Sequence, residues 1–182
     1  PISFRMWFLQ KVIGFNRTAY WPVHHSSTIN SPNKIYVGID TNPGYSTACN
    51  IHGANGIYIG DYTQIASGVG IQSSNHSVYD SREQVPSKPI KIGKYCWLGQ
   101  NVVILPEVEL GDFTIVGAGA IVTKSFPKGY CIVGGVPAKK IRDLNPEECV
   151  QFQNRNKYNG YLKSEKFKND CPVNMGVFNV RD

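Results

Sequence analysis

The sequence predicts an all-β fold, a solenoid of short parallel strands with short helical caps at its N-terminal and C-terminal ends. Three observations support this: an aliphatic residue recurs every six positions, glycine often follows it, and the fifth position of each step is small or β-branched. The aliphatic positions of the longest run are Ile92, Leu98, Ile104, Leu110, Val116 and Val122. A period of six fits neither an α-helix nor a hairpin meander, so we expect one inward side chain per step and a turn between steps.

The other repeat positions support the same coil. Glycine follows the aliphatic residue where the backbone must turn sharply, and small residues fit the corners. The glycines are Gly93, Gly99, Gly111 and Gly117, and the fifth positions are Cys96, Val102, Val108, Thr114 and Ala120. Three steps make one triangular coil, which predicts Ile92 over Leu110 and Leu98 over Val116. The same phase recurs at Ile59, Ile65 and Ile71, with weaker echoes at Val37 and Ile51.

We divide the chain into three segments: a cap and approach segment (1–34), the solenoid (35–137) with a polar loop extruded at 77–89, and a C-terminal helix with a polar tail (138–182). Residues 4–15 are rich in large apolar side chains and predict a short helix, with Gly14 and Asn16 as stop signals. Asn145 is the expected N-cap of a second helix that begins at Pro146. We expect the polar residues from 154 onward to be weakly ordered.

Composition narrows the function classes. Five scattered cysteines with no CxxC pair argue against a disulfide framework and a structural zinc site, so we expect a reduced, cytoplasmic setting and no metal. The net charge of +6 suits a phosphorylated cofactor or a polyanionic acceptor, and we expect no nucleic-acid partner. No apolar stretch approaches the ~18 residues of a membrane span. A membrane-surface role for Arg5, Trp7, Phe8 and Lys11 stays open as an alternative.

Several motifs then carry a family resemblance. They are GIYIGD at 56–61, SNHSVYD at 74–80, PIKIGKYCWLG at 89–99, VGAGA at 116–120 and GVPAK at 135–139. Over residues 16–142 this pattern resembles the hexapeptide-repeat acyltransferases, within them the group of galactoside, maltose and bacterial surface-polysaccharide O-acetyltransferases. The resemblance implies a left-handed parallel β-helix and a homotrimer with active sites between subunits. It also implies acetyl-CoA as donor and a hydroxyl of a sugar or surface-polysaccharide precursor as acceptor.

A neutral alcohol is a poor nucleophile, so acetyl transfer needs a general base, and histidine titrates near working pH. His76 ends a repeat step just before the extruded loop and matches the family's catalytic histidine. Asn75 and Asn50 are candidates to orient the acceptor or stabilise the developing oxyanion. Asp61, Asp80 or a backbone carbonyl could orient the imidazole. His52 is expected to be structural or acceptor-facing, and His24 and His25 to have surface or packing roles.

The resemblance also implies a cofactor site. Gly117 and Ala118 would let the pantetheine arm approach the backbone, and nearby cations would meet the phosphates. The expected cofactor residues are Trp97, Gly117, Ala118, Thr123, Lys124, Pro137, Lys139 and Lys140, with Arg142 as a further cation. Cys96 and Cys131 are not expected to be nucleophiles, because direct transfer needs no acyl-enzyme.

Two alternatives remain beside sugar O-acetylation, and two others are disfavoured. One is N-acetylation of an amino sugar or its nucleotide derivative, and another is a non-catalytic β-helix scaffold. A γ-type carbonic anhydrase would need a histidine pair five residues apart, which the four histidines do not provide. A serine acetyltransferase would carry a long helical N-terminal domain, which this sequence does not show.

Overall fold

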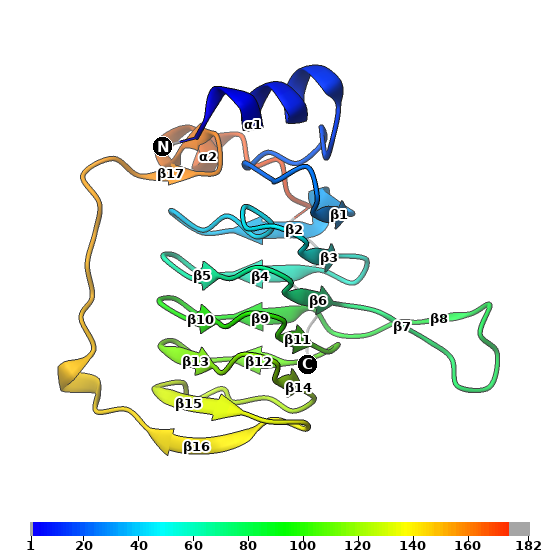
Figure 1. Ribbon diagram of the computed structural model, residues 1–182, viewed down its shortest axis with the longest axis vertical. Coiled ribbons are helices and arrows are strands. Elements are labelled where there is room, and N and C mark those ends of the chain that lie inside the picture. Colours follow the sequence, from blue (N-terminus) through cyan, green and yellow to red (C-terminus); the bar gives the residue numbers. More distant parts are fainter. Residues whose placement is uncertain (1, 175–182) are drawn as a thin grey trace.

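The computed structural model describes residues 2–174. Its strands form three mainly parallel sheets that the chain visits in rotation, so that between β3 and β14 each turn of the chain adds one strand to each sheet (Figure 1). Face 1 contains β1 (Thr28–Asn30), β3 (Asn50–His52), β6 (Gly70–Gln72), β11 (Val103–Ile104) and β14 (Ile121–Val122). Face 2 contains β2 (Ile35–Val37), β4 (Ile57–Ile59), β9 (Ile90–Ile92) and β12 (Glu109–Leu110). Face 3 contains β5 (Gln64–Ile65), β10 (Trp97–Leu98), β13 (Thr114–Val116), β15 (Cys131–Gly134) and the antiparallel β16 (Lys139–Asp143).

The register confirms the predicted stacking. Leu110 pairs with Ile92, and Val116 pairs with Leu98. The inward aliphatic side chains are almost completely buried, and they form one continuous core along the stack. Burial of each such side chain is worth about 1.5–3 kcal/mol, so a sequence repeat with one inward residue per step is enough to specify the coil. The coil already begins at β1, inside the segment that we expected to be only an approach.

Three edges join the faces, and they locate the candidate site. Edge 2–3 carries 60–63, 93–96, 111–113 and 129–130. Edge 3–1 carries 66–69, 99–102, 117–120 and 135–138, and edge 1–2 carries 73–74, 105–108 and 123–125.

One loop leaves the stack at edge 1–2. Ile57 and Ile59 pair with Ile90 and Ile92, so residues 75–87 are inserted without breaking the register of face 2. This insertion, here called the arm, contains the antiparallel pair β7 (Asn75–His76) and β8 (Gln84–Val85) and projects sideways from the coil (Figure 1).

An aromatic ladder lines edge 2–3. Tyr62, Tyr95, Phe113 and Tyr130 all have positive φ, between 45° and 59°, and their rings stack with centroids 5.3, 4.9 and 5.1 Å apart. Each lies at the same place in its coil, so the repeat places one ring above the next. Stacked rings of this kind contribute roughly 0.5–1.5 kcal/mol per pair beyond their burial.

The N-terminal helix crosses the first end of the stack (Figure 1). It consists of α1 (Phe4–Phe8), which continues into a π-helical turn over Leu9–Ile13. The turn ends at Gly14 with φ of 107°, which confirms the predicted helix and its stop signal. A 3-10 turn over Pro32–Lys34 then leads into β2. No helix among residues 2–174 has the length and apolarity to cross a bilayer.

The C-terminal prediction was partly wrong. Asn145 does cap Pro146, accepting a bond from the Glu147 amide at 3.2 Å, but the element is one 3-10 turn (Pro146–Glu148) and not a helix. Residues 149–157, here called the strap, then run back along the stack to its first end (Figure 1).

The tail that we expected to be weakly ordered is anchored as far as residue 174. It forms β17 (Tyr158–Asn159), β18 (Leu162–Lys163) and α2 (Ser164–Asn169). Asn159 and Phe167 are buried there, and the Asn159 side chain donates to the Val37 carbonyl at 3.0 Å. The remainder of that prediction, 175–182, lies outside the described residues.

Candidate functional site

The arm carries the predicted base. Asn75 and His76 are both exposed, and His76 pairs with Gln84 across the two strands of the arm. The Ser77 amide donates to the Glu83 carbonyl at 2.8 Å, which closes the arm beyond the histidine. The imidazole of His76 is therefore presented on a short two-stranded projection, clear of the core.

Side chains of face 1 lie at the root of the arm. The His52 ring Nδ1 lies 3.4 Å from the Ser74 hydroxyl, two residues before His76. The Ser73 hydroxyl donates to the His52 carbonyl at 2.9 Å. Asn50 begins the same strand as His52, at the end of that strand away from the arm. Its side chain is exposed, and its carbonyl accepts a hydrogen bond from the Gln72 side chain at 3.2 Å. His52 thus contacts the root of the arm through Ser74.

Neither predicted aspartate holds the His76 ring. Asp61 lies at edge 2–3, where it accepts from the Ile39 amide at 2.8 Å and lies 3.5 Å from the Lys94 ammonium. Asp80 is in the arm, but it binds Arg82 at 2.7 and 3.0 Å, and this bond lowers the pKa of the Asp80 carboxyl. Within residues 2–174 the His76 ring has no hydrogen-bond partner in the same chain.

Edge 3–1 presents bare backbone. A Cβ built on Gly99, one coil earlier, would meet the Ala118 amide nitrogen at 2.7 Å, so packing requires glycine there. A Cβ on Gly117 would make only ordinary contact, 3.5 Å from the Val133 carbonyl, and its φ is not positive. The fold would accept a side chain at 117, so the glycine leaves free space on the outer side of this edge.

The other predicted cofactor residues fall into three groups. Ala118 and Pro137 lie beside Gly117 on edge 3–1, and Lys139 and Lys140 follow Pro137 on β16. Trp97 points outward from face 3 with 55% of its surface exposed, between Gln64 and Ile115. Thr123 and Lys124 are exposed on edge 1–2, the edge from which the arm departs.

The two lysines of β16 differ in their surroundings. The Lys140 ammonium binds both carboxylate oxygens of Asp143, at 2.9 and 3.0 Å, and this bond raises the Lys140 pKa. Lys139 is exposed and makes no such bond within the described chain. Lys139 is therefore the lysine whose charge is available to a ligand.

The buried cysteines have unreactive surroundings. All five are free, and Cys96, Cys131 and Cys49 are buried. Burial raises the pKa of the Cys96 thiol to about 12, so it is almost entirely protonated at neutral pH. Among residues 2–174, no group of three or more His, Cys, Asp or Glu side chains is placed to hold a metal ion.

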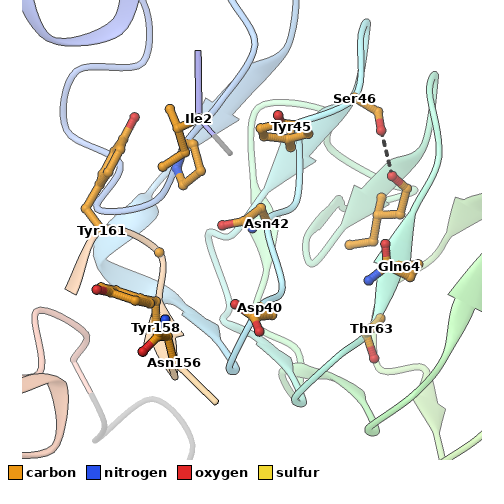
Figure 2. A pocket seen from close by; sticks show the side chains of 13 residues that line it. Ile2, Asp40, Asn42, Tyr45, Ser46, Thr63, Gln64, Asn156, Tyr158 and Tyr161 are labelled. Carbon is orange, nitrogen blue, oxygen red and sulfur yellow. Dashed lines mark hydrogen bonds between the residues drawn. The ribbon is translucent and has the colours of Figure 1, made fainter. Parts of the chain in front are cut away.

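One cavity of the structure is not indicated by any sequence pattern. It has a volume of about 730 Å³ and lies where face 3 begins, between the coil and the tail (Figure 2). Asn42 lies between the tail side chains on one side and Tyr45 and Gln64 on the other, and its buried Oδ1 has no hydrogen-bond partner among residues 2–174. Gln64 is the register neighbour of Trp97. The tail residues that line the cavity, among them Tyr158 and Tyr161, are far along the chain from the coil residues around it. No local sequence pattern therefore indicates the cavity.

Comparison with known proteins agrees with this architecture. A family model described as bacterial transferase hexapeptide (six repeats) matches residues 89–124. Galactoside O-acetyltransferase of Escherichia coli (strain K12) is 38% identical over 95 residues, which cover 50% of this chain and 46% of that protein. A structure of galactoside acetyltransferase in complex with coenzyme A is similar, with a TM-score of 0.55 at 28% identity, over 73% of this chain and 70% of that one. The chain thus spans about half the length of the first curated relatives it matches.

A further relative is matched over most of its length. A probable macrolide acetyltransferase of Lysinibacillus sphaericus is 31% identical over 144 residues, which cover 68% of this chain and 76% of that protein. The two chains therefore share the repeat and much of what flanks it. With this match and the six-residue repeat recognised by the family model, the chain belongs to the hexapeptide-repeat transferase family.

Proposed function

We propose that this protein is an acetyltransferase that moves the acetyl group of acetyl-CoA to a hydroxyl of a sugar or surface-polysaccharide precursor, with His76 as general base. We infer, with the family, that the coil is left-handed and that the chain works as a cytoplasmic homotrimer. The family relation and the exposed histidine on the arm support this function.

The observation that carries the proposal is Gly117. The fold does not need a glycine there, whereas a ligand that lies along edge 3–1 does need the space. A pantetheine arm is a narrow chain with amide groups, and the exposed backbone of 117–119 offers it close approach. Trp97 lies on the adjoining face, and Lys139 follows at the end of the edge, where a phosphate would meet its charge.

The position of His76 supports a site shared between copies. The arm leaves from edge 1–2, and the groove residues Gly117, Ala118 and Pro137 lie on edge 3–1, with face 1 between them. In a trimer, the arm of one copy can reach the groove of its neighbour. His76 of one copy would then complete the site formed by Gly117 and Trp97 of another.

The proposed chemistry is one direct transfer. Acetyl-CoA supplies an activated acyl group, and the acceptor hydroxyl attacks its carbonyl carbon. His76 takes the hydroxyl proton as the new C–O bond forms, and the proton passes to the departing thiolate when the C–S bond breaks. Asn75 or Asn50 would donate to the oxyanion, and holding both substrates in one geometry supplies the remaining rate.

The deciding experiment is a transfer assay across sugars and nucleotide sugars, with products identified by mass spectrometry and NMR. His76→Ala should lower kcat by about 100-fold or more with little change in the affinity for CoA. His25→Ala, another exposed histidine, is the matched control and should keep its activity. Full activity of His76→Ala would remove His76 from its role, and acetylation of amines alone would replace the hydroxyl acceptor with an amino sugar.

A further inference from the structure

The N-terminal helical segment, Phe4–Phe8 with Leu9–Ile13, is packed with its polar side toward the protein. Gln10 is fully buried. Its amide donates to the Trp21 carbonyl at 2.8 Å, and its Oε1 accepts from the Val23 amide at 3.1 Å and from the Tyr161 hydroxyl at 2.6 Å. Lys11 also turns inward, donating to the Ala19 carbonyl at 2.7 Å.

The apolar side chains of the same segment face outward. Phe4 is 76% exposed, Val12 and Ile13 are more than half exposed, and Trp7 and Phe8 are close to 40% exposed. The Phe4 ring lies 6.0 Å from the Trp7 ring and 6.1 Å from the Phe8 ring, so the three form one patch. A helix at the end of a stack normally buries its apolar stripe and exposes its polar one. This reversal indicates that something apolar covers the outer side.

The charge around the patch indicates what covers it. Residues 1–39 contain no Asp or Glu, and the first acidic residue of the chain is Asp40. Arg5 and Arg17 are both exposed: Arg5 lies in the helix that carries the aromatic patch, and Arg17 follows shortly after the segment ends at Gly14. A second copy of this segment would offer these two arginines no acidic partner, whereas lipid phosphates would.

We propose that the outer side of the helical segment 4–13 binds the surface of an anionic membrane, lying in the plane of the interface. Aromatic rings suit the boundary between headgroups and acyl chains, and exposed arginines at their margin meet the phosphates. The bonds of Gln10 hold the segment to the coil, so the stack would be carried on the membrane by its first end. This proposal does not depend on the catalytic role of His76.

The test is flotation of the chain with vesicles of pure phosphatidylcholine and with vesicles that contain about one third phosphatidylglycerol. We expect binding to the anionic vesicles that weakens as salt is added. Arg5→Gln with Arg17→Gln should lower the partition coefficient on anionic vesicles by about 25-fold, since each basic residue near such a surface contributes a factor of roughly five. Trp7→Ser with Phe8→Ser should lower it by at least about tenfold on both vesicle types.

Val150→Ser is the matched control, because Val150 is 73% exposed but lies in the strap, and it should bind like the unmodified chain. Circular dichroism and the mass in solution are measured for every variant. Absence of binding to anionic vesicles would overturn the proposal, and so would equal binding by Trp7→Ser/Phe8→Ser and Val150→Ser. A variant that loses its oligomeric mass while its vesicle binding is unchanged would instead make the patch a contact between copies.

Discussion

Two glycines at the same position of the six-residue step, but on different edges of the coil, separate the requirements of the fold from those of the ligand site. Gly93 and Gly117 both follow an inward aliphatic residue. A Cβ on Gly93 would lie 2.6 Å from the Asp112 amide nitrogen and 2.7 Å from the Gly111 carbonyl carbon. A Cβ on Gly117 would meet nothing nearer than the Val133 carbonyl at 3.5 Å. Gly93→Ala should therefore damage the stack, and Gly117→Ala should not.

The magnitudes follow from these contacts. A side-chain oxygen of Asp112 and two backbone atoms of the next coil obstruct position 93, and because the backbone atoms cannot turn aside, the coils must separate by several tenths of an ångström. Overpacking of this kind costs about 1–3 kcal/mol, and we expect the upper end, with a loss in Tm of about 6–12 °C. Gly117→Ala should change the free energy of unfolding by no more than about 0.5 kcal/mol. It should weaken CoA binding about tenfold or more, which corresponds to about 1.4 kcal/mol.

Thermal unfolding and calorimetric titration with CoA measure both effects on the same samples. Gly93→Ala serves as the control in the titration, because edge 2–3 lies away from the proposed groove, and its folded fraction should bind CoA normally. If Gly117→Ala binds CoA as tightly as the unmodified chain, then edge 3–1 is not the pantetheine groove. If Gly93→Ala is as stable as the unmodified chain, the packing argument for the repeat glycines is wrong.

Three further substitutions test the cofactor cations and the strap. Lys139→Ala should weaken the binding of CoA about fivefold more than the binding of dephospho-CoA. Lys140→Ala should have a smaller effect, because Asp143 already binds its ammonium. Titration with the two ligands measures this, and equal losses for both would mean that Lys139 does not bind the 3′-phosphate. Phe152→Ala should lower the free energy that holds the strap in place by about 1–2 kcal/mol, since the ring lies 5.0 Å from that of Tyr62 and 5.5 Å from that of Tyr95. Trypsin should then cleave the strap at Arg155 before the stack unfolds. Val150→Ala is the control. A strap that resists trypsin equally in both variants would contradict that account.

The sequence predicts the coil well where the repeat is regular. Each inward residue is chosen by burial alone, so the phase from Ile92 to Val122 predicts the register of three sheets. Upstream the coils are longer, with Ile35 beside Ile57 and Ile29 beside Ile51, and the extra residues disrupt the period. This is why Thr28–Asn30 was not predicted as a strand of the coil.

The tail was mispredicted because its order comes from distant partners. Its composition is polar, and a local reading favours disorder. One phenylalanine, Phe167, is buried there, with its ring 5.4 Å from that of Tyr20, and Asn159 is bonded to the second strand of the coil. Pro146 begins a turn as predicted, but Phe152 then packs on the aromatic ladder, and this contact favours an extended chain over a helix.

Site prediction had a similar limit. Motif positions identify which residues to consider, but only the edge on which each lies decides which ones can meet. Asp61 and His76 belong to different edges, so Asp61 cannot serve as the orienting group within one chain. The cavity around Asn42 combines coil and tail residues, which no single stretch of sequence could indicate.

The strap has a consequence for how the whole stack comes apart. In an open array of repeats, each coil is held by its neighbours alone, and the terminal coils can peel away one at a time. Here the chain leaves the last coil and runs back to the first. The Tyr95 hydroxyl, midway along the stack, donates to the Phe152 carbonyl at 2.7 Å, and Asn154 bonds to Asp40 in the first coil. Fraying at the far end would therefore pull on contacts at the near end. The two ends should therefore unfold together, and the array should melt as a single cooperative unit rather than coil by coil.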